Sequence, residues 1–99
     1  MNLVLCLCPD GKTRSFSIDH KNLNVIFDNQ TLQFCGSLEN AVAVARLHPR
    51  EHDETNVFTL KYPQYFDVTK GDILLLGSDE KGFACDIDLV SIMDILKLK

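Results

Sequence analysis

The sequence lacks an apolar run long enough to cross a membrane. Its longest apolar stretches, residues 3–8 and 73–76, fall well short of the ~20 residues that a spanning helix needs. The N-terminus also lacks the basic region that opens a signal peptide, and the acidic residue Asp10 follows early. We therefore expect a cytoplasmic protein that makes no membrane contact.

Clusters of Lys or Arg are also missing. Residues 1–49 contain four acids and four bases, whereas residues 50–99 contain ten acids and six bases, so the second half supplies the whole net charge of −4. An acidic surface repels the phosphates of DNA and RNA at long range. The charge distribution therefore predicts that nucleic acid is not a partner.

Familiar catalytic signatures are absent too. The sequence has neither a Walker A motif nor a dinucleotide-binding fingerprint. Ser78 lies in Gly77-Ser78-Asp79, which is not the Gly-x-Ser-x-Gly turn of a serine nucleophile. Asp86 and Asp88 share one face of a predicted strand, where paired acids are typical of an exposed sheet edge. We predict no catalytic residue and no cofactor.

The four cysteines are few for a secreted domain that depends on disulfides, which favours reduced thiols. Cys6 and Cys8 share a strand face, because side chains alternate along a strand. Together with Cys35 and Cys85 they offer four zinc ligands. Structural zinc sites usually place two ligands at Cys-x₂-Cys spacing, and that spacing is absent. Packing of the thiols in the core, without a metal, is the favoured interpretation.

A second candidate metal site is the pair His48 and His52, which have the spacing of two ligands on one helical face. Pro49 interrupts any helix between them. The acids that follow, Glu51 and Asp53 among them, can add oxygen ligands. A solvated loop is the favoured interpretation, with a weak metal site as the alternative.

Strand patterns dominate a chain of 99 residues, which is the length of one domain, residues 1–99. Residues 2–8 and 73–76 are apolar on both faces and predict central strands. Residues 13–19 alternate after a turn at Pro9-Asp10-Gly11, and further strands are expected over 57–62 and 83–88. A second hairpin is expected from 23–28 to 31–35.

Two helices are expected. Leu38, Ala41, Val42 and Ala45 fall at helical spacing, so the sequence predicts a helix over 37–48, begun by a Ser N-cap and ended by a Pro. Asp88 can cap a second helix over 88–97, for which a strand is the alternative. The predicted fold class is α+β, with a compact, mainly antiparallel sheet or partly open barrel of six or seven short strands.

Two short segments resemble known families. Residues 1–18 are similar to the opening hairpin of ubiquitin, but a second predicted hairpin follows instead of the long helix. Residues 68–74, Val-Thr-Lys-Gly-Asp-Ile-Leu, resemble the turn that leads into a strand in small β-barrels, including the PUA/ASCH group. The second resemblance implies RNA binding, although the Gly-x-Lys-x-x-Glu-x-Arg signature of ASCH domains is absent.

The leading functional prediction is a non-catalytic protein-interaction module that forms a homodimer. Two central strands need cover on both faces, whereas one helix at 37–48 covers only one. The apolar C-terminal segment is therefore the predicted interface, comprising Leu89, Val90, Ile92, Met93, Ile95 and Leu96. The alternative is a small RNA-binding β-barrel, and the third candidate is a small enzyme whose site is shared between subunits.

Overall fold

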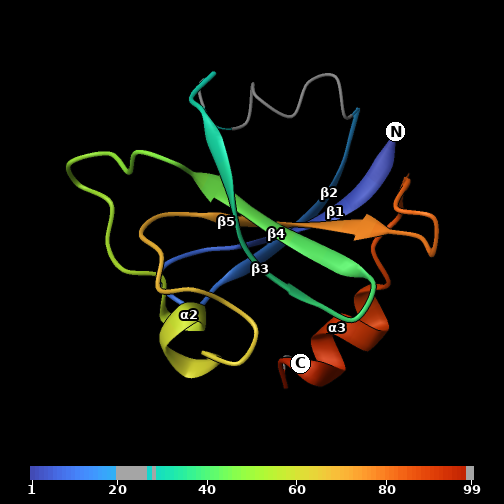
Figure 1. Cartoon of the computed structure of the whole chain (residues 1–99). Coiled ribbons are helices and arrows are strands. Elements are labelled where there is room, and N and C mark those ends of the chain that lie inside the picture. The colour runs from blue at the N-terminus through green and yellow to red at the C-terminus, as the bar shows by residue number, and fades with distance from the viewer. Residues whose placement is uncertain (20–26, 28, 98–99) are drawn as a thin grey trace.

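The fold is an antiparallel sheet with two short helices, seen in a computed structural model that describes residues 1–19, 27 and 29–97 (Figure 1). The strand order is β2-β1-β5-β4-β3, and β6 pairs with the end of β5. The sheet is open, with β2 and β3 at its edges, which confirms the α+β class. The strands are β1 (Asn2–Leu7), β2 (Thr13–Ile18), β3 (Leu32–Leu38), β4 (Ala41–Arg46), β5 (Ile73–Ser78) and β6 (Ala84–Cys85). The helices are α2 (Val57–Lys61) and α3 (Leu89–Ile95).

Strands β1 and β5 lie side by side in the middle of the sheet, as their apolar sequences predict. Their register pairs Val4 with Leu76 and Leu7 with Ile73. One sheet face, the helical face, is covered by α2 and α3 and carries Leu5, Leu7, Ala41, Ala43, Ala45, Ile73 and Leu75 (Figure 1). The opposite face carries Val4, Cys6, Ile18, Val44, Leu74 and Leu76, which pack with Phe27. The two hydrophobic clusters are therefore separated by the sheet itself.

The predicted helix over 37–48 is wrong, because this segment forms the β3–β4 hairpin. Glu39 turns the chain with a positive φ of 47°. From residue 41 the sequence alternates Ala with Val, so the alanines point to the helical face and Val44 to the opposite one. This alternation suits a strand with both faces covered. The small alanines leave room for aromatic side chains of the helical layer.

The predicted strand over 57–62 is also wrong, because α2 occupies most of it. Asn56 caps this helix, since its side-chain oxygen accepts a hydrogen bond from the backbone N–H of Phe58. Phe58 and Tyr62 are buried one turn apart, whereas Leu60 between them is 59 % exposed. This is the burial pattern of a helix on a sheet. Pro63 follows directly and prevents the helix from continuing.

The second predicted helix is confirmed as α3, and its predicted cap is Asp88. The Asp88 carboxylate accepts hydrogen bonds from the backbone N–H and the hydroxyl of Ser91, at 3.1 and 3.0 Å. Ile92 and Leu96 insert into the cluster under the sheet. The Tyr62 hydroxyl donates to the Leu96 carbonyl and so joins the two helices.

Two other strand predictions have different outcomes. The strand expected over 83–88 shortens to β6. Of the expected hairpin from 23–28 to 31–35, the second arm lies in the region of β3, while residues 23–26 and 28 lie outside the described part of the chain. No helix among the described residues combines the length and the apolar character that crossing a bilayer requires.

Candidate functional site

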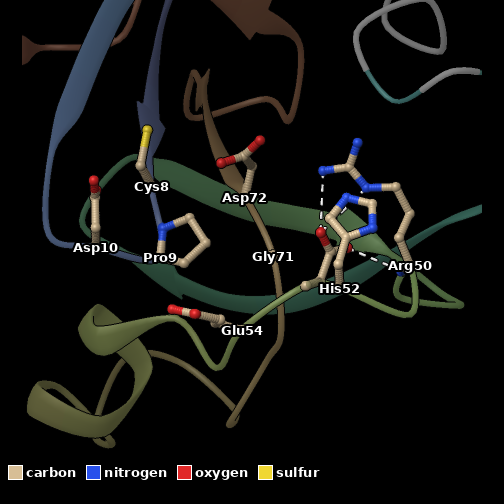
Figure 2. Close-up of a pocket in the computed structure, with 9 residues that line it drawn as sticks. Cys8, Pro9, Asp10, Arg50, His52, Glu54, Gly71 and Asp72 are labelled. Atoms are coloured by element: carbon tan, nitrogen blue, oxygen red, sulfur yellow. Dashed lines mark hydrogen bonds and ion pairs between the residues drawn. The ribbon is translucent and has the colours of Figure 1, made fainter.

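A cavity of about 260 Å³ lies where the end of β1, the start of β5 and the loop over 50–54 meet (Figure 2). The turn after β1 contributes one wall, and the residues that lead into β5 contribute another. The side chains that give the cavity its chemical character are Cys8, Asp10, Arg50, His52, Glu54 and Asp72. The cavity therefore combines a thiol, carboxylates, an imidazole and a guanidinium.

The loop over 50–54 is held by a clasp between Arg50 and Asp53. The Arg50 guanidinium lies 3.0 Å from the Asp53 carboxylate, which also accepts the Arg50 backbone N–H at 2.9 Å. Burial acts to raise the pKa of Asp53, but the hydrogen bonds and positive charge of Arg50 outweigh it and lower the pKa. Gly71 passes so close that a Cβ there would lie 2.9 Å from the carboxylate. The clasp thus fixes the loop against the entrance to β5.

Asn56 joins the three segments that form the cavity. Its side-chain N–H₂ donates to the carbonyls of Leu7 and Gly71, each at 2.9 Å, while its oxygen caps α2. The residue is fully buried. Sequence reasoning missed it as part of a polar loop, although Asn is a preferred N-cap and could have indicated the helix.

Cys6, Cys8 and Asp72 form a cluster beside the cavity. One potential ligand atom from each residue lies within 4.8 Å of the other two. The antiparallel β1–β5 pairing creates this cluster, because Leu7 at the end of β1 faces Ile73 at the start of β5, which brings Cys8 after β1 beside Asp72 before β5. Figure 2 shows Cys8 and Asp72 on neighbouring strands at the cavity. Sequence reasoning placed the two thiols on one face but missed the carboxylate.

The surroundings of this cluster are electrostatically mixed. Burial, then the Asp72 carboxylate and then Cys8 raise the pKa of the Cys6 thiol to about 12. Arg14 lies opposite Cys6 on β2, and its guanidinium interacts electrostatically with both thiols. The hydrogen bond with Cys6 is the main reason that the pKa of Arg14 is raised. The cluster therefore contains three groups that can become anionic and one permanent cation.

The four cysteines do not converge as a set. All are free, and Cys35 lies on the helical face, away from the pair in β1. Burial raises the pKa of the Cys35 thiol to about 11. Cys85 is half-buried in β6, at the other end of β5. A four-cysteine zinc site is therefore excluded, because the sheet separates Cys35 from Cys6.

The other predicted candidates have local roles. His48 and His52 are both exposed, His52 at the edge of the cavity, and neither histidine belongs to the ligand cluster found among the described residues. Asp86 accepts the backbone N–H of Leu3 at 2.7 Å, and Asp88 caps α3. Both acids line a second cavity of about 310 Å³ together with Ser78. Both carboxylates thus accept hydrogen bonds from backbone N–H groups.

The predicted interface residues divide into two groups. Ile92 and Leu96 are buried in the chain's own core, at 2 % and 0 % exposure. Leu89, Met93 and Ile95 are half-buried at the edge of the helical layer, and Val90 is 81 % exposed. The structure thus leaves four of the six residues partly or fully accessible. The homodimer itself stays a prediction.

Comparison of the chain with protein-family models, curated protein sequences and solved structures found no match. Functional inference therefore rests on the residues and geometry of this chain.

Proposed function

We propose that this protein is a non-catalytic interaction module that forms a homodimer through the exposed side of α3. The observation that carries the proposal is Val90, an apolar side chain that is 81 % exposed on a helix whose Ile92 is buried in the core. Met93 lies one helical turn after Val90, and Leu89 directly precedes Val90. These two half-buried residues therefore extend the same surface. This accessible strip of α3 is defined here as the α3 patch: Leu89, Val90 and Met93.

The chain next to α3 adds further apolar surface. The backbone N–H of Ile87 donates to the carbonyl of Leu3 at 3.0 Å, so the N-terminus runs beside the segment that enters α3. Met1, which precedes β1, is 86 % exposed, and Phe83, which precedes β6, is 68 % exposed. Isolated apolar side chains are common on protein surfaces, but an exposed one that adjoins half-buried apolar residues, as Val90 does on α3, favours an interface.

A two-fold dimer is the simplest partner arrangement for such a patch. In a closed pair the same surface of each chain meets its counterpart, so no second protein is required. The proposal places the dimer in the cytoplasm, where four free cysteines stay reduced. The alternative within the same proposal is that the α3 patch binds a protein of different sequence.

Sedimentation equilibrium of Val90→Asp tests the proposal against a matched control. Val90 is the second residue of α3, where an acid suits the helix dipole, so the variant should remain folded. Burial of a Val side chain is worth about 1.5–3 kcal/mol, and a two-fold interface contains it twice. We expect the dimer to weaken by at least about 100-fold, since each 1.4 kcal/mol is tenfold.

The control is Val68→Asp, the same substitution at an exposed valine. Val68 is 68 % exposed and lies in the segment between α2 and β5, and Figure 1 places α2 and α3 below different ends of the sheet. This variant should dimerise like the parent protein. Equal association constants for the parent and Val90→Asp would remove the α3 patch from the proposed interface.

A further inference from the structure

We propose that Cys6, Cys8 and Asp72 bind one Zn²⁺ ion, with a water in the neighbouring cavity as the fourth ligand. The three potential ligand atoms already lie within 4.8 Å of one another. Two thiolates on a tetrahedral zinc lie about 3.7 Å apart, given Zn–S bonds of about 2.3 Å. Side-chain rotations alone can supply a contraction of this size, because Cys6 lies in β1 and the other two ligands directly adjoin the paired ends of β1 and β5.

The backbone around the cluster is rigid. Cys6 pairs with Leu74 on β5 and with Arg14 on β2, so β1 is held on both sides at this point. The Asn56 side chain donates hydrogen bonds to the carbonyls of Leu7 and Gly71, so it ties the residue before Cys8 to the residue before Asp72. A site built on paired strands needs little reorganisation to accept an ion.

The donor set selects zinc among the common metals. Thiolates are soft ligands that exclude Mg²⁺ and Ca²⁺, whereas the carboxylate of Asp72 is a hard ligand that suits Zn²⁺ better than Cu⁺. Charge leads to the same choice. Two thiolates and one carboxylate carry three negative charges, which Zn²⁺ and the guanidinium of Arg14, the residue opposite Cys6 on β2, balance to neutrality.

The cavity explains why three protein ligands are sufficient. Cys8 and Asp72 both line this cavity of about 260 Å³ (Figure 2), so two of the three proposed ligands border on open space. Such a space is large enough for an ordered water, and His52 and Glu54 on its walls offer hydrogen-bond partners. Three protein ligands and one water are the arrangement of an open zinc site.

Metal binding is tested on the reduced, purified chain by titration with ZnCl₂ against a chromophoric chelator. We expect one Zn²⁺ per chain with submicromolar affinity, and thiolate-to-metal charge-transfer absorption when Co²⁺ replaces Zn²⁺. Loss of an outer hydrogen-bond partner already weakens metal sites by about 10–100-fold. Removal of a ligand in Cys8→Ser or Asp72→Asn should therefore weaken binding by more than about 100-fold.

The matched control is Cys85→Ser, because Cys85 is half-buried like Cys8 but belongs to β6. It should bind Zn²⁺ like the parent chain and keep the cobalt absorption. Cys6→Ser alters the core, so the two half-buried ligands decide the outcome if that variant fails to fold. Absence of submicromolar binding, or binding that survives both Cys8→Ser and Asp72→Asn, would overturn the proposal.

Discussion

Asn56→Ala should be among the most destabilising single substitutions in this chain. The Asn56 side chain makes three hydrogen bonds, to the carbonyls of Leu7 and Gly71 and from the N–H of Phe58. A buried polar group that loses its partner costs about 1–3 kcal/mol, and loss of an N-cap costs about 1 kcal/mol. The free energy of unfolding should therefore fall by about 4 kcal/mol. In a domain of this size 1 kcal/mol shifts Tm by about 4–8 °C, which predicts a fall in Tm of about 20 °C.

Asn56→Asp separates the cap from the cross-link. The aspartate keeps an oxygen for the Phe58 N–H but loses both donors and places a carboxylate against the carbonyls of Leu7 and Gly71. Burial raises the pKa of such a carboxyl in the folded state. The destabilisation should therefore be greatest at neutral pH and shrink as the pH falls and the group becomes protonated.

Urea unfolding followed by circular dichroism measures both effects, with Asn40→Ala as the control. Asn40 is exposed in the turn between β3 and β4, and the same substitution there should change stability by less than about 0.5 kcal/mol. If Asn56→Ala costs no more than Asn40→Ala, the cross-link does not stabilise the fold and this reasoning is refuted.

Three other predictions concern acid stability, a crowded glycine and nucleic acid. Because the pKa of Asp53 is lowered in the folded state, Asp53→Asn should reduce the free energy of unfolding at pH 7. This difference between the variant and the parent should disappear as the pH falls below about 4. A difference that is independent of pH would contradict the role of the Arg50 clasp. Gly36→Ala should cost about 3 kcal/mol, since its Cβ would lie 2.1 Å from the Tyr65 carbonyl oxygen. Gly82→Ala, whose Cβ meets nothing within 4 Å, is the control in the same denaturation assay for the backbone strain of the positive φ that both glycines have. Fluorescence polarisation with single-stranded RNA near 150 mM salt should detect no micromolar binding, whereas binding that weakens steeply with salt would favour the RNA-binding alternative.

The sequence was sufficient to predict features that depend on one segment of the chain at a time. Residues 2–8 and 73–76 are apolar on both faces, and they form the adjacent central strands β1 and β5. Asp88 precedes an apolar helical stripe and caps α3. In each case the local pattern and the tertiary environment agree, which makes local reasoning reliable.

Prediction failed where one segment satisfied two periods. Leu38, Ala41, Val42 and Ala45 have helical spacing, but Ala41 to Ala45 also alternate with period two. A partner that is distant in sequence decided the outcome, because Val42 pairs with Leu76 of β5. A single sequence contains no direct record of such pairing.

The cluster of Cys6, Cys8 and Asp72 was half predictable for the same reason. Cys6 and Cys8 share a face by alternation alone, which the structure confirms. Asp72 is 64 residues beyond Cys8 in the numbering and joins the cluster only through the β1–β5 register. The carboxylate could therefore be identified as a neighbour only after the strand order was known.

Native mass spectrometry of the unmodified protein at high micromolar concentration tests the central claim most directly. The proposed interaction module should be observed at twice the chain mass of 11.2 kDa. A single 11.2 kDa species at that concentration would contradict self-association through the α3 patch.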